Sequence, residues 1–284
     1  MKRLIIIFLA IPCIVFAQIP SNQYLRGIHF FNTQHGIITC ESGKMYQTIN
    51  GGSTWSEMPQ ITGSYIRYFA QSDISTYFIS GYDGVLLKST DNGFTWSLMN
   101  CGTNTQLTQL TFTSPTTGYL LGINGFAQKT TDGGETWNQM DIPTTQSVTS
   151  IKFINDTTGF IGGFGGVFRT TDAGETWTQV LTDGIYVSYQ DLYFTDPLHG
   201  VAVGYSGRIQ VTSNGGDTWT QITSGTSENL YDVTFSTPLK GFAAGRGGTF
   251  ISTNDGGNSW NIIQLNPVVM LILWLNFLIL SMVI

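Results

Sequence analysis

Six tryptophans at nearly constant spacing constrain the fold of this chain more than any other feature. They are Trp55, Trp96, Trp137, Trp177, Trp219 and Trp260, and successive members are 41, 41, 40, 42 and 41 residues apart. Each one closes a version of the stretch from Thr130 to Trp137, which reads Thr-Thr-Asp-Gly-Gly-Glu-Thr-Trp. A fixed period of this length is the signature of a repeat architecture. The sequence therefore predicts six similar structural units.

Three kinds of residue recur at fixed positions before each tryptophan. A hydroxyl residue stands one and seven positions before it. A glycine stands three positions before it, at Gly52, Gly93, Gly134, Gly174, Gly216 and Gly257. Asp or Asn stands five positions before it, at Asn50, Asp91, Asp132, Asp172, Asn214 and Asp255. We expect the carboxylate or amide to accept hydrogen bonds from N–H groups two or three residues on, and the glycine to supply a positive φ. These residues are thus predicted to hold turns together, with no catalytic or metal-binding role.

Each unit also contains four short runs with strand character. In the third unit they are 110–114, 119–122, 126–130 and the run from Trp137 onward. Apolar residues alternate or form short bursts, and no sustained period of 3.6 residues appears. Propeller blades of four antiparallel strands contain ~40–50 residues and close in rings of about four to eight. The sequence predicts an all-β protein, a β-propeller of six blades, or seven if a further segment adds one, in a single domain over residues 20–266.

The N-terminal segment has the pattern of a secretory signal peptide. Residues 1–17 contain Met-Lys-Arg, an apolar run from Leu4 to Phe16, and small residues before Gln18. Removal of this segment leaves ten basic and eighteen acidic residues, a formal net charge of −8. Such a charge disfavours nucleic acid as a partner. We therefore expect an exported protein, either secreted or associated with the cell envelope.

The C-terminal segment, 267–284, contains no charged residue. Three interpretations remain open. Residues 268–284 are numerous enough for a membrane anchor, since ~17–25 apolar residues span a bilayer. The segment could instead supply a strand that closes the ring, or the start of a seventh blade.

The repeated pattern Ser/Thr-x-Asp-x-Gly-x-Thr-Trp resembles the Asp box, also called the BNR repeat. Together with the glycine spacing that precedes it, the pattern is similar to that of the photosystem II stability and assembly factor family over residues 24–265. This resemblance implies a propeller, seven-bladed in that family, that binds a membrane-protein subunit or its precursor and has no catalytic residues. The resemblance implies a protein partner of the membrane-protein class, while a photosynthetic role for this chain does not follow from it.

An exported glycan-binding propeller or a sialidase-like glycoside hydrolase is the alternative. Sialidases resemble six-bladed propellers with Asp boxes, but this chain offers no dedicated arginine triad among Arg26, Arg67, Arg169, Arg208 and Arg246. Seven of its acids lie inside the boxes, which leaves few for the paired carboxylates of glycoside hydrolysis. His29, His35 and His199 lack metal-ligand spacing, and the last two are expected at an exposed turn. We therefore expect no catalytic residues, no metal and no cofactor.

Two further features bear on function and stability. Lys88, Lys129 and Arg169 occupy equivalent positions in units two, three and four, and they are candidates for a basic row that binds a partner. Cys40 stands where other units carry Gly81, Gly122, Gly162, Gly204 and Gly245, which suggests a small buried strand residue. Spacing alone does not decide whether Cys40 pairs with Cys101.

Overall fold

The computed structural model describes residues 24–184 and 186–264, which form six antiparallel sheets of four strands each. The first three sheets contain β1 (Leu25–Phe30), β2 (Gly36–Cys40), β3 (Met45–Thr48) and β4 (Ser56–Glu57); β5 (Ile66–Gln71), β6 (Tyr77–Gly81), β7 (Leu86–Ser89) and β8 (Ser97–Met99); and β9 (Leu107–Phe112), β10 (Gly118–Gly122), β11 (Ala127–Thr130) and β12 (Asn138–Gln139).

The last three sheets repeat this order. They contain β13 (Val148–Phe153), β14 (Gly159–Gly163), β15 (Gly166–Thr170) and β16 (Thr178–Thr182); β17 (Tyr189–Phe194), β18 (Gly200–Gly204), β19 (Ile209–Thr212) and β20 (Thr220–Ile222); and β21 (Leu230–Phe235), β22 (Gly241–Gly245), β23 (Phe250–Thr253) and β24 (Asn261–Ile262). Three single-turn 3₁₀ helices, η1 (Tyr82–Gly84), η2 (Tyr205–Gly207) and η3 (Arg246–Gly248), connect second to third strands.

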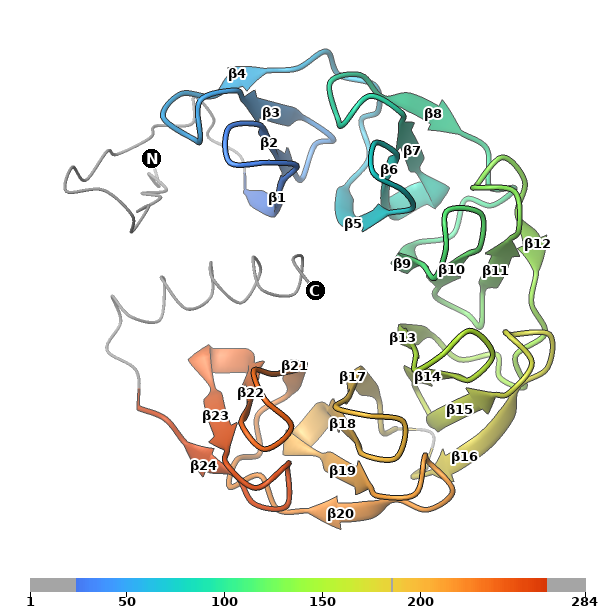
Figure 1. Cartoon of the computed structure of the whole chain (residues 1–284), viewed down its shortest axis with the longest axis vertical. Coiled ribbons are helices and arrows are strands. Elements are labelled where there is room, and N and C mark those ends of the chain that lie inside the picture. The colour runs from blue at the N-terminus through green and yellow to red at the C-terminus, as the bar shows by residue number, and fades with distance from the viewer. Residues whose placement is uncertain (1–23, 185, 265–284) are drawn as a thin grey trace.

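The six sheets stand side by side as blades around a central axis (Figure 1). Within each blade the strands follow sequence order, with the first strand at the centre and the fourth at the rim. Figure 1 also shows that the described ring is open between the blade of β1 and the blade of β21. The prediction of an all-β propeller with six four-stranded blades is confirmed.

The strands differ in detail from the sequence prediction. In the third blade the first strand begins at Leu107, three residues before the predicted start. In the fourth blade, Gly163 pairs with Val148, just as Gly81 pairs with Ile66 in the second blade. Gly163, and not Gly162, is therefore the counterpart of Cys40, because this unit of 40 residues has a shorter turn between its second and third strands.

The core lies mainly between neighbouring blades. Five buried clusters each combine residues of two adjacent blades. The aromatic residue that ends most first strands packs edge-on against the tryptophan of its own blade, as Phe153 does with Trp177 at 6.4 Å between ring centroids. Phe153 also stacks on Tyr119 of the preceding blade at 4.4 Å. Each blade is thus stabilised by its neighbour, as expected for a repeat protein.

The structure bears on the pairing of the two cysteines and on the two apolar terminal segments. Cys40 and Cys101 are both buried and are not joined by a disulfide. The signal peptide (1–17) and the apolar segment (267–284) lie outside the described residues. Within 24–184 and 186–264, no helix is long and apolar enough to cross a membrane.

Candidate functional site

One face of the ring carries the Asp-box turns, and we call it the box face. On this face the turn between the first and second strands is bonded to the box, as in the hydrogen bond from Gly133 N to Thr116 O at 2.9 Å. The opposite face, which we call the loop face, carries the turns between the second and third strands. It also carries the connections between blades, and there Tyr82 N donates to Tyr65 O at 2.8 Å.

The box turn is held by a small hydrogen-bond network that is the same in every blade. In the third blade, Asp132 accepts hydrogen bonds from Thr136 N at 2.9 Å and from Thr130 Oγ1 at 2.7 Å. Thr130 Oγ1 in turn accepts one from Gly134 N at 2.9 Å, and Gly134 has a φ of 81°. The carboxylate therefore accepts a hydrogen bond from an N–H four residues on, one residue beyond the predicted range of two or three.

These bonds explain the electrostatics of the box acids. The hydroxyl of Thr136 donates to Asp132, and this bond, with the Thr136 N–H, lowers the pKa of Asp132 to about 2. The same arrangement with Thr176 lowers the pKa of Asp172 to about 2. A carboxylate with so low a pKa remains charged at neutral pH and is unsuited to donating a proton. The box carboxylates therefore hold the turns together.

Lys88, Lys129 and Arg169 reach from one blade to the box of the next. Lys88 pairs with Glu135 at 2.6 Å, Lys129 with Glu175 at 2.5 Å and Arg169 with Asp217 at 2.6 Å. Lys88 and Arg169 also donate to box carbonyl oxygens, those of Gly133 and Gly215. The three residues lie at equivalent positions of β7, β11 and β15, and their charges are engaged in ion pairs between blades. That they bind a partner stays a prediction.

The second box departs from this arrangement. Phe94 takes the place of the acid, and its ring stacks on His35 at 4.0 Å between centroids. The expectation that His35 lies at an exposed turn is therefore wrong, because Phe94 covers it and only 3% of its surface is accessible.

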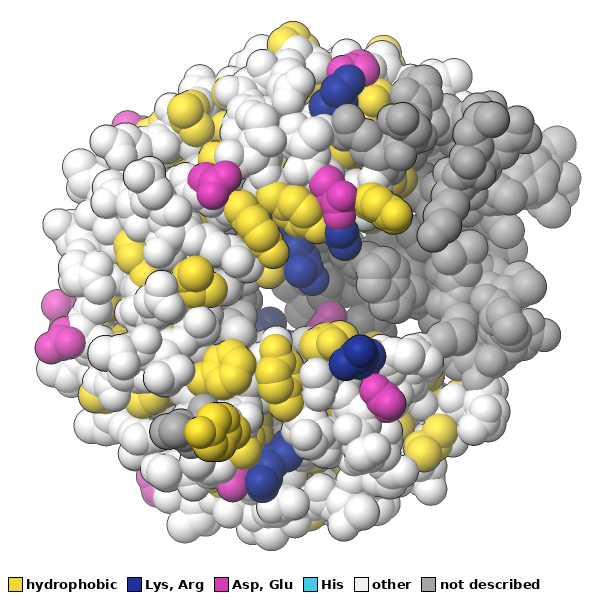
Figure 2. Space-filling model, turned by 180° about the vertical axis from the view of Figure 1, so that it is seen from behind, with side chains coloured by type: hydrophobic (Ala, Val, Ile, Leu, Met, Phe, Trp, Pro, Cys, Tyr) yellow, Lys and Arg dark blue, Asp and Glu magenta, His cyan; other side chains and the backbone are white. Residues whose placement is uncertain are grey.

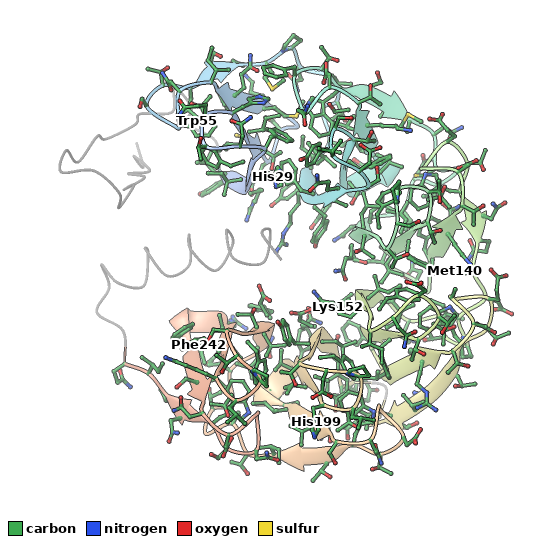
Figure 3. The ribbon with its side chains drawn as sticks, viewed as in Figure 1. His29, Trp55, Met140, Lys152, His199 and Phe242 are labelled. Atoms are coloured by element: carbon green, nitrogen blue, oxygen red, sulfur yellow. The ribbon has the colours of Figure 1, made fainter. Side chains whose placement is uncertain are left out.

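The three histidines are not brought together. His29 and His199 lie in the first and fifth blades, on different sides of the ring (Figure 3). His29 packs among Phe31, Phe69 and Tyr77, and burial lowers its pKa to about 4. A neutral imidazole in an aromatic pocket is best understood as a core residue. Within residues 24–184 and 186–264 no group of three potential metal ligands occurs.

The first strand of each blade, which lies nearest the centre of the ring, is called its inner strand. Two carboxylates, Asp191 and Asp232, approach one another on neighbouring inner strands, β17 and β21. Asp191 accepts hydrogen bonds from Ser150 Oγ at 2.9 Å and from Val233 N at 3.2 Å. Burial raises the pKa of Asp232 well above its usual range, and the charge of Asp191 adds to the rise. Lys152, which Figure 3 shows on the inner side of the ring, partly offsets both effects. Asp191 thus joins blades and is already occupied by two donors.

The loop face carries hydrophobic and basic side chains around the centre of the ring, as Figure 2 shows. In the first two blades, the rings of Tyr65 and Tyr82 stack at 4.7 Å. The guanidinium of Arg26 lies 5.0 Å from the centroid of Tyr65, and it also pairs with Glu41. Arg67 lies 5.1 Å from the centroid of Tyr68. We call these residues, with Tyr24, the tyrosine–arginine cluster.

A second aromatic group lies across the ring on the same face. Phe164 and Tyr205 pack edge to face at 5.6 Å, and Tyr186 and Tyr231 are exposed. Arg246, in η3, is also exposed. In the described part of the chain, neither Arg67 nor Arg246 has an acidic partner. Exposed tyrosines with unpaired arginines are typical of surfaces that bind other molecules.

Sequence reasoning missed this surface. Its signal was nevertheless present in the position that follows the second strand of each blade. That position holds Glu41, Tyr82, Ile123, Phe164, Tyr205 and Arg246. The neighbouring framework positions repeat while this one varies, and variable loops on a rigid scaffold are where binding residues concentrate.

Comparison with known proteins identifies relatives of this fold. The family described as Photosynthesis system II assembly factor YCF48 matches residues 94–186 and 184–267, more than half of the chain. None of the curated proteins matches the sequence.

Several solved structures share the fold at low sequence identity. A structure of YCF48 bound to D1 peptide is 18% identical with a TM-score of 0.67, covering 86% of this chain and 82% of the other. YCF48 from Cyanidioschyzon merolae is 19% identical with a TM-score of 0.67, covering 88% and 87%. A GH74 xyloglucanase from Xanthomonas campestris is 14% identical with a TM-score of 0.66, and this chain covers only 45% of it.

Proposed function

Because the chain belongs to the YCF48 assembly-factor family, we propose that it is a non-catalytic, exported propeller that binds a protein partner through its loop face. The family match carries the proposal, and the YCF48 structure with a bound D1 peptide supports it, since a peptide is bound there to the same fold. Export rests on the sequence pattern of residues 1–17 alone.

The loop face indicates the chemistry of the partner. The tyrosine–arginine cluster offers flat aromatic surface beside Arg67, a cation without an acidic partner in the described residues. Arginine binds carboxylates through two parallel hydrogen bonds, and tyrosine buries apolar area while keeping a polar end. The cluster therefore suits an extended peptide segment that contains acidic residues. A membrane protein with such a segment is the partner expected from the family.

A glycan ligand is the second candidate. Exposed tyrosines also suit sugar rings, and the GH74 xyloglucanase shares the fold. The box acids are engaged in turns, however, and Asp191 is engaged between blades. These contacts favour binding over hydrolysis.

A pull-down with the tagged mature chain from the envelope fraction of its source tests the proposal. Light cross-linking and mass spectrometry should recover one or a few proteins at near-stoichiometric level. Arg67→Gln combined with Tyr82→Ala should reduce that recovery by about tenfold or more, because both groups lie at the cluster. The control is Leu239→Ala, which alters an exposed apolar residue on the box face and should leave recovery unchanged.

Two results would contradict the proposal. Equal loss of the partner in the Leu239→Ala control would show that the loop face is not the binding surface. Recovery of glycans without any protein would favour the carbohydrate candidate, and measurable hydrolysis of a polysaccharide would overturn the non-catalytic assignment.

A further inference from the structure

The last blade has one face that the described residues leave partly exposed, whereas the second strands of the other five blades are fully buried. In each of the first five blades, every residue of the second strand is buried. In β22 of the last blade, Phe242, Ala244 and Gly245 remain partly exposed. Figure 3 shows Phe242 on the blade that borders the opening of the ring.

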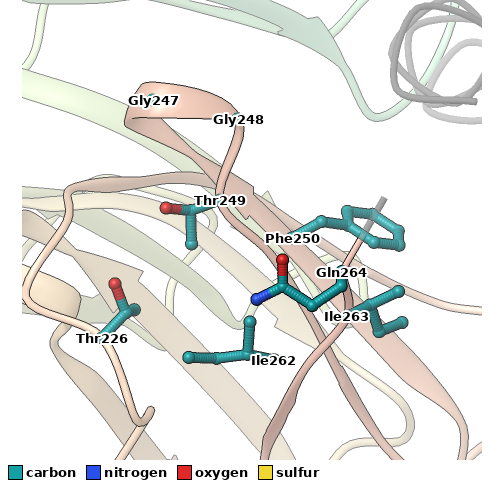
Figure 4. Close-up of a pocket in the computed structure, with 8 residues that line it drawn as sticks. All are labelled: Thr226, Gly247, Gly248, Thr249, Phe250, Ile262, Ile263 and Gln264. Atoms are coloured by element: carbon teal, nitrogen blue, oxygen red, sulfur yellow. The ribbon is translucent and has the colours of Figure 1, made fainter. Parts of the chain in front are cut away.

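The preceding blade shows which direction these residues face. Val201 and Val203 of β18 occupy the places of Phe242 and Ala244, and both belong to the cluster formed with β21–β24. Phe242 and Ala244 therefore face the position that a following blade would occupy. Phe250 faces the same way and stacks on Phe242 at 5.5 Å. A shallow pocket lined by Phe250, Ile262 and Ile263 lies beside them (Figure 4).

The inner strand of the last blade also carries a polar side chain, Asp232, at a position that forms hydrogen bonds between other blades. Between blades three and four, the side chain of Gln109 accepts a hydrogen bond from Ile151 N at 2.7 Å. Between blades five and six, Asp191 accepts one from Val233 N at 3.2 Å. Both acceptors are the third residue of an inner strand, and both donors are the fourth residue of the next. Asp232 is the third residue of the last inner strand and is therefore the register equivalent of these acceptors, and its carboxyl group also contacts Asp191 of the preceding blade.

The sequence after the last box continues the register of the repeat. Inner strands begin 11 residues after the preceding tryptophan in four cases and 12 in the fifth, counted from Trp55, Trp96, Trp137, Trp219 and Trp177. Eleven residues after Trp260 stands Leu271. The first and fourth residues of all six inner strands are apolar or aromatic, and Leu271 and Trp274 continue that pattern. The sixth position is Asn276 where most blades have Phe, although the second blade has Gln71 there.

We propose that residues 271–276 dock as a seventh inner strand on this open face, with the N–H of Trp274 donated to a carboxyl oxygen of Asp232. The side chains of Leu271 and Trp274 then cover Ala244 and Phe242. In the existing blades a bulge between the first and third residues turns the first and fourth toward the preceding blade. The same bulge would direct Leu271 and Trp274 toward β21 and β22.

The length and attachment of the segment favour it over a separate partner. Between the end of a fourth strand and the next inner strand, the chain runs from Glu57 to Ile66 and from Ile222 to Leu230. The path from Ile262 to Leu271 is as long as the first of these. A segment tethered at this distance has a high effective concentration at the face, which a second copy lacks.

Site-specific cross-linking of the mature chain tests the proposal. A disulfide requires Cα atoms about 4.4–6.8 Å apart, as expected for a third and a fourth residue on adjacent inner strands. The pair Asp232→Cys with Trp274→Cys should form an intramolecular disulfide under mild oxidation. The matched control, Asp232→Cys with Leu275→Cys, places the second thiol at the fifth position, which faces the following blade, as His29 does toward Phe69, and should cross-link about tenfold less.

A second measurement avoids any change at Asp232 and Trp274. In the unaltered chain, the amides of 271–276 should exchange with deuterium as slowly as those of β21, and Phe242→Asp should remove this protection. Equal cross-linking of the two pairs, or rapid exchange of 271–276 in a chain that unfolds cooperatively, would overturn the proposal. A disulfide between two copies of the chain would also overturn it and would indicate self-association. Protection of 271–276 that appears only with lipid vesicles would overturn it in favour of a membrane anchor.

Discussion

The box face and the loop face of this ring are built from the same repeats but differ in kind. On the box face, polar side chains are used inside the fold, as Asp132 is in its turn and Lys129 is in its ion pair with Glu175. On the loop face, Tyr82 is exposed, and Arg67 lacks an acidic partner among the described residues. The difference teaches that repetition marks the residues that build the ring, while departures from repetition mark those free to bind.

The largest expected effect is a difference in the free energy of unfolding between a substitution in a box and one on the loop face. Trp177 is buried and donates a hydrogen bond to Gly174 O at 3.2 Å. Trp177→Ala should lower the free energy of unfolding by ~3–5 kcal/mol, because it removes a large packed side chain from the core between blades. Tyr186→Ala, which alters an aromatic residue exposed on the loop face, should change it by less than about 0.5 kcal/mol. Urea denaturation followed by circular dichroism measures both, and similar losses would erase the distinction.

A smaller loss is expected from a single box acid. Asp91 accepts hydrogen bonds from Thr95 N at 2.9 Å and from Ser89 Oγ at 2.8 Å. Asp91→Ala should cost about 1–2 kcal/mol of stability, since these donors lose their partner. Asp91→Asn should cost less, because Asn50 and Asn214 make the same contacts in their own boxes. Partner recovery by the folded variants should be unchanged; a selective loss of binding would assign function to the box face.

Acid should weaken the box face before it affects the loop face. The pKa of Asp132 and that of Asp172 are lowered to about 2, below the ~3.9 of an unfolded chain. Their contribution to stability is therefore complete above about pH 4 and is lost as pH falls toward 2. The urea midpoint should fall between pH 5 and pH 2, and it should fall less in Asp132→Asn with Asp172→Asn. An equal fall in that double variant would show that other groups govern acid unfolding.

The smallest expected effect concerns the ion pairs between blades. A double-mutant cycle of Lys129→Met and Glu175→Gln should give a coupling energy of about 0.2–1 kcal/mol, because Glu175 is largely exposed and water screens the pair. The cycle compares the free energies of unfolding in urea of the unaltered chain, the two single variants and the double variant. A coupling near zero, together with weaker partner recovery by Lys129→Met, would favour the predicted basic row over a structural tie.

The box turns could be predicted because their contacts are local. Thr130, Asp132, Gly134 and Thr136 lie within seven positions of one another, so residue types at fixed spacing suffice to identify the turn. The reach of the carboxylate to the fourth residue was missed, since spacing alone does not distinguish between neighbouring N–H groups. The burial of His35 was missed for another reason: it depends on Phe94 of the next blade.

The sequence by itself determined the repeat period, the strand content of each unit and the residues that close each turn, because all three depend on contacts within a few positions. Only the tertiary structure decided which side chains meet between blades. Lys88 meets Glu135 across 47 residues, and Arg26 meets Tyr65 across 39, because the ring places equivalent positions of successive units side by side. The same geometry leaves Phe242 partly exposed while burying Val201, its counterpart one blade earlier.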